Sequence, residues 1–230
     1  MKPNDFYVGI IHFFAILVPG SIASALLVQE LHREFFFMFS VVLQHQAAVW
    51  ISFLICSYFI GHLIFLVGSW LDMLHDRIRK SLYNYCQNDQ NLLAGVFNGI
   101  LKLKANQAAY ERLEAIRDTF LQAAKTGAMN PIQWGKAVLL MKHPAALDEV
   151  NRLEADSKFF RSMVVVCLLA AALFSCSTNC HCSSPALLVA ALCYIRYAER
   201  RIKSDSHTAF YIITMESIGS LKPPSPQTSA

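Results

Sequence analysis

The sequence predicts an all-helical membrane protein with about four transmembrane helices and a cytoplasmic helical domain between the second and the third. Three observations support this prediction. Of the 230 residues, 55% are hydrophobic and 16% are charged, which is outside the usual balance of soluble domains. The apolar residues are gathered into long blocks, and basic residues collect beside one end of most blocks.

Four apolar blocks are candidate spans. No formal charge occurs in 7–28 or in 47–71, and each stretch can form the helix of about 20 residues that crosses hydrocarbon. The third block is interrupted only by Arg161, which we expect to snorkel to the interface. The fourth, 184–197, is short and becomes adequate if Arg196 snorkels too. The predicted boundaries are 1–28, 47–72, 159–178 and 184–203, the last including an extension beyond the membrane.

Basic residues indicate how the spans are oriented. They follow the second and fourth spans and lead into the third: Arg77, Arg79, Lys80, Arg152, Lys158, Arg161, Arg196, Arg200, Arg201 and Lys203. Cytoplasmic loops carry the excess of Lys and Arg, so both termini and 73–158 are predicted to be cytoplasmic, in a bacterial inner membrane. The connectors 29–46 and 179–183 then face outside. The net charge of +4 suits an anionic leaflet and requires no nucleic-acid partner.

A cleaved signal peptide is an alternative for the first block, because residues 23–25 are small and have the spacing of a cleavage site. Under that alternative the second span still runs inward. The predicted cytoplasmic location of 73–158 is the same in both cases.

The segment 73–158 has the patterning of a helical domain. Its apolar residues are spaced by three or four positions or by sums of these: Leu93, Val96, Phe97, Ile100, Leu113, Ile116 and Phe120. Asn130 and Pro131 are typical of an N-cap and a first helical residue. The next helix is predicted to begin at His143 and Pro144 and to continue unbroken into the third span, because no Gly or Pro intervenes.

The chain beyond the fourth span is predicted to have a joint at 204–206, whose residue types favour helix caps over helix interiors. The apolar run 209–215 is too short to cross a membrane. We expect 204–218 to dock on the cytoplasmic helices or on a partner, as a helix or as a strand. The Pro-rich segment 219–230 is predicted to be a disordered tail.

An aromatic run occupies the outer connector and consists of Phe35, Phe36, Phe37 and Phe39 around Met38. Its length is that of an interfacial helix and not of a span. One hypothesis is an outer lid or a membrane-thinning wedge. The alternative is an ordinary anchoring helix.

Histidines in the spans are functional candidates, because an ionisable group in hydrocarbon is costly. His62 lies in the middle of the second span and could pair across helices, line the aqueous path of a pore or bind a metal. A neutral imidazole satisfied by a neighbouring helix is the alternative. His12 lies near the cytoplasmic end of the first span and is predicted to be interfacial.

Small residues within the first two spans predict close helix packing. Gly20 with Ser24, and Ser57 with Gly61, have the small-xxx-small spacing that lets two backbones approach.

Asp72, His75 and Asp76 share one helical face at i, i+3 and i+4. Carboxylates and imidazole at this spacing could hold a divalent metal or act as acid and base at the membrane surface. The sequence has no HExxH, P-loop, Gly-x-Ser-x-Gly or dinucleotide motif to complete such a site. The alternative is a solvated helix end that pairs with Arg79, and we expect no metal and no cofactor.

Three cysteines, Cys176, Cys180 and Cys182, cluster in and beside the outer connector. In an oxidising compartment two of them could form a disulfide. In a reducing compartment they would remain thiols, and their spacing is not that of a standard zinc site.

These features predict a non-enzymatic, oligomeric membrane effector or accessory subunit that couples a cytoplasmic protein partner or signal to membrane permeability. The expected partners are the lipid bilayer, further copies of the chain and that cytoplasmic protein. The layout resembles, in architecture only, small bacterial four-helix membrane proteins that act as pore-forming effectors in phage defence. Two alternatives are a membrane-embedded metal-dependent hydrolase or lipid-modifying enzyme using Asp72 and His75, and a small oligomeric channel or transporter.

Overall fold

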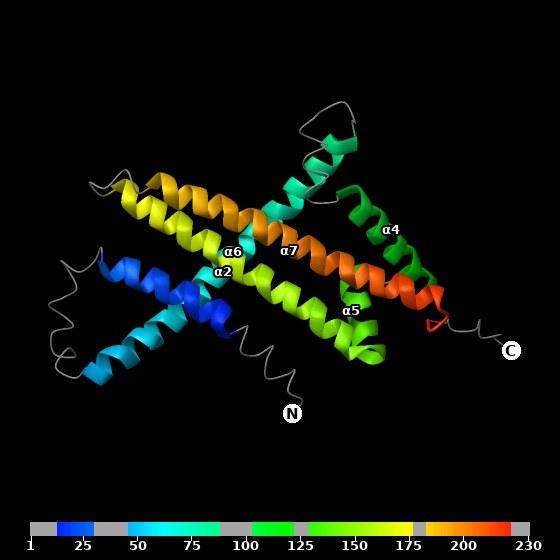
Figure 1. Ribbon diagram of the computed structural model, residues 1–230, viewed down its shortest axis with the longest axis horizontal. Helices are drawn as coiled ribbons and strands as arrows, with labels where there is room; N and C mark the ends of the chain where they lie inside the picture. The colour runs from blue at the N-terminus through cyan, green and yellow to red at the C-terminus, as the bar shows by residue number, and fades with distance from the viewer. Residues whose placement is uncertain (1–12, 30–45, 88–102, 122–128, 177–182, 222–230) are drawn as a thin grey trace. The chain divides into compact units, whose positions relative to one another are not determined.

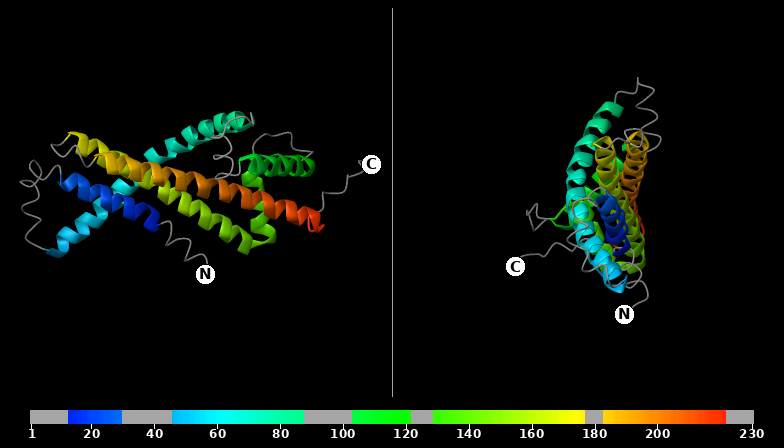
Figure 2. Two further views of the ribbon diagram at one scale, coloured as in Figure 1. Left: turned by 45° about the horizontal axis from the view of Figure 1, so that its top comes forward. Right: turned by 90° about the vertical axis from the view of Figure 1, so that its left-hand side faces the viewer.

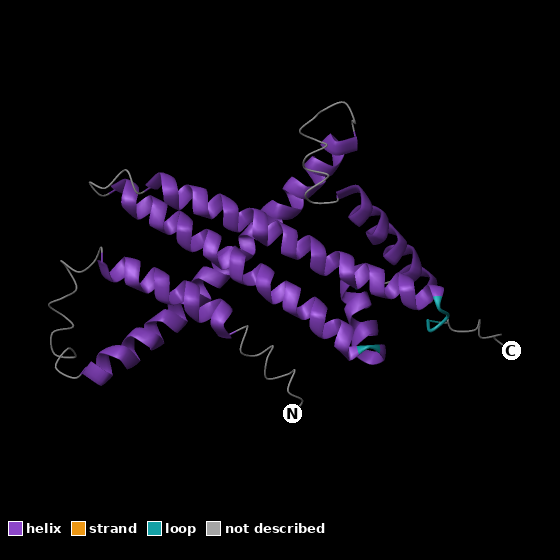
Figure 3. Cartoon of the chain, in the orientation of Figure 1, coloured by secondary structure: helices purple, strands orange, loops and turns teal. Residues whose placement is uncertain are grey.

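The computed structural model describes residues 13–29, 46–87, 103–121, 129–176 and 183–221. Within these residues the chain is helical and contains no strand, which confirms the all-helical part of the prediction there (Figure 3). The helices are Phe13–Gln29, α2 (Gln46–Gln87), α4 (Leu103–Phe120), α5 (Pro131–Lys142), α6 (Pro144–Cys176) and α7 (Ser183–Ser217) (Figure 1).

Two helices are long and apolar enough to cross a membrane, Gln46–Ser81 of α2 and Pro144–Ser175 of α6. The helix Phe13–Gln29 is apolar but shorter. Two of the four predicted spans therefore have the required length and composition in the part of the chain that the structure describes. In the most apolar stretch of α2 only 22% of the residues are buried, which favours a membrane helix over the core helix of a soluble protein.

Contacts within the chain divide it into two compact units. Unit 1 consists of Met1–Arg77 and Ala155–Ala198, and unit 2 consists of Ile78–Glu154 and Glu199–Ala230. Each of α2, α6 and α7 contributes residues to both units. In unit 1 the parts of α6 and α7 that belong to it lie side by side (Figure 2).

Unit 1 contains a close crossing between Phe13–Gln29 and α2. A Cβ added at Gly20 would lie 1.9 Å from the carbonyl oxygen of Ser57, and one added at Gly61 would lie 2.3 Å from the carbonyl oxygen of Ile16. Ser57 is fully buried there. The two backbones are in contact, so the predicted close approach at these small residues is confirmed.

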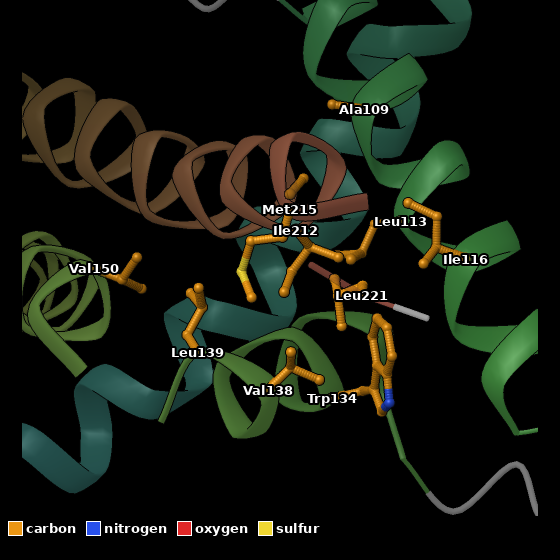
Figure 4. Packing of buried hydrophobic residues seen from close by; sticks show 11 residues of the cluster. Ala109, Leu113, Ile116, Trp134, Val138, Leu139, Val150, Ile212, Met215 and Leu221 are labelled. Atoms are coloured by element: carbon orange, nitrogen blue, oxygen red, sulfur yellow. The ribbon is translucent and has the colours of Figure 1, made fainter. Parts of the chain in front are cut away.

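Unit 2 is built around an apolar core that α4, α5, α6 and α7 share (Figure 4). Its buried residues are Ala109, Leu113, Ile116, Trp134, Val138, Leu139, Val150, Ala209, Ile212, Met215 and Leu221. The predicted stripe residues Leu113 and Ile116 are in this core, and Phe120 packs against it. Leu93, Val96, Phe97 and Ile100, also assigned to that stripe, lie outside the described residues.

Local signals place the ends of α5 and α6 as predicted. The Asn130 side-chain oxygen accepts a hydrogen bond of 3.0 Å from the backbone N–H of Ile132, and Pro131 is the first helical residue. The cap satisfies one of the N–H groups that a helix start leaves without a partner. α6 begins at Pro144 and runs without interruption to Cys176, which confirms the predicted continuous helix.

The predicted joint at 204–206 is wrong, because α7 is one helix from Ser183 to Ser217. The hydroxyl of Ser206 donates to the carbonyl oxygen of Ile202 at 2.7 Å. The hydroxyl of Thr208 donates to the backbone carbonyl oxygen of Ser204 at 3.0 Å. Bonding of these hydroxyls to the preceding turn keeps the polar residues inside the helix. The apolar run that follows docks on the core of unit 2 as a helix, and the alternative of a strand is excluded.

A polar cluster connects α6 and α7 within unit 2. The hydroxyl of Tyr211 donates a hydrogen bond to the Glu149 carboxylate, whose other oxygen lies 3.3 Å from Nδ1 of His207. The hydrogen bond to Glu149 raises the pKa of Tyr211 above its usual 10.0, and burial raises this pKa further. The neutral phenol is therefore the form that the folded state favours.

We predict that Gly20→Val destabilises the protein by about 1–3 kcal/mol, because its side chain must force the two helices apart. The measurement is the free energy of unfolding in detergent micelles. Ala47→Val, at an exposed position of α2, is the matched control and should change this free energy little. Equal effects of the two substitutions would mean that the crossing does not exist in the folded protein.

Stability should depend on Tyr211 at alkaline pH. Its raised pKa gives the folded state a stability that is complete below the unfolded pKa of about 10 and is lost as the pH rises through the folded pKa. Between pH 9 and pH 12, roughly the range in which tyrosines titrate, the unfolding free energy of Tyr211→Phe should therefore fall less steeply than that of the wild type. Parallel curves would contradict the hydrogen bond to Glu149.

Candidate functional site

An ion pair with a buried arginine and a partly exposed aspartate connects α2 and α6 in unit 1. Arg161 stands at the start of the apolar part of α6, its side chain is only 5% exposed, and its Nη1 donates to Oδ2 of Asp72 on α2. The sequence analysis expected Arg161 to snorkel to the interface and did not expect this counter-charge, which neutralises the guanidinium where it lies.

Three more residues complete the surroundings of the pair. The hydroxyl of Tyr197 on α7 donates to Oδ1 of Asp72 at 2.6 Å, so both carboxylate oxygens accept a hydrogen bond. The Arg161 guanidinium carbon lies 4.6 Å from the centroid of the Phe65 ring, a cation–π contact. A Cβ added at Gly68 would lie 3.3 Å from Arg161 Nε, so this glycine makes room for the arginine.

His75 lies one turn beyond Asp72 on α2 and packs among aromatic rings. It is 4% exposed, and its ring centroid lies 5.2 Å from that of Tyr197 and 6.2 Å from that of Tyr194. Asp76, the next residue, is exposed. The helical face predicted from the spacing is therefore divided: α7 covers His75 and leaves Asp76 at the surface.

The contacts of Asp72 are those of an ion pair. In the part of the chain that the structure describes, no three His, Cys, Asp or Glu side chains are grouped so that they could hold a metal ion. Both oxygens of Asp72 are engaged by Arg161 and Tyr197. Arg79, expected to pair with the acidic cluster, instead lies 3.4 Å from Asp205 within unit 2.

The other predicted residues have separate positions. His62 is exposed on α2, and its ring lies edge-on to Tyr58 with the centroids 4.5 Å apart. The side chains of the remaining candidates lie outside the described residues: His12, Phe35, Phe36, Phe37, Phe39, Cys176, Cys180 and Cys182.

Sequence reasoning missed Tyr197 and Phe65, and it did not join Arg161 to Asp72. One signal was available, since a charge within an apolar block needs a partner on another helix. That signal calls for a partner but does not identify it, because 89 positions separate Arg161 from Asp72.

No protein-family model, curated protein or solved structure matches the chain. Its function is therefore inferred from the arrangement of its own residues.

The ion pair should dominate the stability of unit 1. Asp72→Asn leaves the Arg161 charge buried without its counter-charge, and we expect a loss of about 2–4 kcal/mol in unfolding free energy, the lower part of the range because Asp72 is partly exposed. Asp72→Asn combined with Arg161→Gln should recover part of this loss.

Glu199→Gln is the control, since Glu199 pairs with the exposed Lys203 at 2.7 Å. It should cost less than about 1 kcal/mol. A strictly additive double variant would show that Asp72 and Arg161 do not interact in the folded protein.

Proposed function

We propose that this chain is a non-enzymatic, oligomeric membrane effector or accessory subunit that couples a cytoplasmic partner or signal to membrane permeability. The observation that carries the proposal is the Asp72–Arg161 pair. It holds α2 to α6, and α6 continues without a break into residues that form the core of unit 2. A structural change in unit 2 can thus be transmitted to the ion pair along the continuous helix α6.

Exposed apolar side chains support placing unit 1 in a bilayer. On α2 they include Trp50, Ile51, Leu54, Ile55, Phe59, Leu63, Leu66, Val67 and Trp70, and on α7 Leu187, Leu188, Leu192 and Ile195. Such a surface is costly in water and favourable in hydrocarbon. We propose four spans, with Phe13–Gln29 and the apolar part of α7 completing the set, in a bacterial inner membrane.

The proposed orientation puts unit 2 and both termini in the cytoplasm. Its support is the basic residues that flank the spans. Unit 2 has the ordinary composition of a soluble helical domain, with a shared apolar core and ion pairs such as Lys136 with Glu154 at 2.6 Å. A cytoplasmic protein or ligand that binds this unit is the proposed input.

The ion pair supplies two distinct states for the coupling. Inside an apolar unit, an unpaired Arg161 or Asp72 costs several kcal/mol, so the pair is either formed or replaced by hydration of both groups. An element with two discrete arrangements is what a switch requires. Separation of α2 from α6 would bring water to the pair, which is the proposed link to permeability.

The hydrolase alternative has less support in the geometry. A carboxylate that accepts bonds from Arg161 and Tyr197 is a poor metal ligand and a poor general base. A pore-forming effector of phage defence is the most specific form of our proposal, and its support is the resemblance in architecture alone.

The first test is dye leakage from liposomes of phosphatidylethanolamine and phosphatidylglycerol that contain the purified full-length protein. Asp72→Asn should increase the leakage rate several-fold over the wild type, because it weakens the contact between α2 and α6. Glu199→Gln should leave the rate unchanged. If liposomes with any of the three proteins retain the dye equally well, the proposed link to permeability is wrong and a scaffold subunit is favoured.

The same variants test the coupling through α6. Asp72→Asn should speed amide hydrogen exchange in α5 of unit 2, since coupling between two sites is reciprocal. A Gly-Gly insertion after Asp156 should abolish this effect, whereas an Ala-Ala insertion of the same length keeps the helix stiff and should retain it. The same response with both insertions would exclude transmission through α6.

A further inference from the structure

The exposed face of α2 carries an imidazole in an apolar setting. His62 lies well inside the apolar stretch Gln46–Ser81, and its neighbours Phe59 and Leu66 are 65% and 59% exposed. His62 makes an edge-on ring contact with Tyr58. Within the part of the chain that the structure describes, its imidazole takes part in no hydrogen bond.

A neutral imidazole has one N–H donor and one acceptor nitrogen, and acyl chains offer neither a partner donor nor a partner acceptor. Within the bilayer that we propose for unit 1, an imidazole on this face is therefore costly unless another molecule satisfies it. Another side of α2 is already occupied, because Ser57 and Gly61 contact the helix Phe13–Gln29. At the edge of the exposed face Tyr58 stacks on Phe13, with the ring centroids 6.5 Å apart, and the rest of that face is available to a partner.

Spacing on this face is that of a helix-packing seam. Residues three, four or seven positions apart lie on one side of α2, and those around His62 are exposed: Ile51, Ile55, Tyr58, His62, Leu66 and Met73. Apolar residues at such intervals pack well against a parallel helix. His62 stands in the middle of the row.

We propose that the partner is a second copy of this chain, whose α2 packs in parallel on the same seam so that the two His62 imidazoles hydrogen-bond each other. Copies inserted in one orientation present His62 at equal depth, and a two-fold axis along the membrane normal then brings the two rings together. Each ring supplies the donor or the acceptor that the other needs. The inference rests on the proposed function and names the interface of its oligomer.

Energy transfer between donor- and acceptor-labelled full-length protein, diluted in the liposomes described above, measures the dimer. His62→Phe keeps the ring but removes the hydrogen bond, and the dissociation constant should rise by about threefold to twentyfold, as for other polar contacts between membrane helices. His62→Asn retains a donor and an acceptor and should stay close to the wild type. A dimer that is equally tight in all three proteins would overturn the proposal.

Cross-linking locates the interface independently of affinity. With the other cysteines replaced, a single Ile55→Cys on the seam should form a disulfide between copies in the membrane. The native Cys56 is exposed but points about 100° away around the helix. A protein with Cys56 as its single cysteine should therefore form little disulfide between copies, and it serves as the matched control. Equal cross-linking at both positions would overturn the seam.

The outcomes also separate this inference from the function on which it rests. If dye leakage still responds to Asp72→Asn while no dimer forms, or while cross-links fall on another helix, the α2 interface is wrong and the effector proposal stands. If a His62-dependent dimer forms in liposomes that stay tight for every variant, the interface stands and the proposed permeability function is wrong.

Discussion

The charge of Arg161 is the constraint around which unit 1 is arranged. A guanidinium that is nearly sealed from solvent needs a counter-charge, and Asp72 on α2 provides it. Tyr197 then satisfies the second carboxylate oxygen from α7, and Phe65 covers the cation. Three helices are thereby connected by one polar cluster.

The same cluster sets the surroundings of the acidic and histidine residues of α2. The spacing of Asp72, His75 and Asp76 correctly places them on neighbouring helical positions. Tertiary packing then decides their roles, because tyrosines of α7 surround His75 and leave Asp76 in solvent. A motif on one helix therefore carries little information about chemistry until its neighbours are known.

Features encoded locally were predictable from the sequence. The cap at Asn130, the first position at Pro131 and the unbroken course of α6 follow from residue types within a few positions of each other. The apolar stripe through Leu113 and Ile116 follows from helical periodicity. The close crossing at Gly20 follows from small residues at a spacing of four.

Features that depend on distant residues were not predictable. Snorkelling of Arg161 was the sensible expectation for an unpaired arginine, and only the packing of α2 on α6 reveals its partner. The prediction of a joint at 204–206 was wrong for a related reason. Serine favours helix ends when its hydroxyl competes with the backbone, but here Ser206 bonds to the preceding turn and is buried.

The long separation of Asp72 from its partners has a consequence for biogenesis. During synthesis the helix Phe13–Gln29 and α2 can pair as soon as both are made, since the contact at Gly20, Ser57 and Gly61 lies between these two helices. Asp72 is then present long before Arg161 and Tyr197 emerge from the ribosome, 89 and 125 positions later. In the membrane that we propose, the end of α2 that carries Asp72 must stay near water until α6 supplies Arg161. Assembly is therefore ordered, and the last helix to insert fixes the pair formed by Phe13–Gln29 and α2.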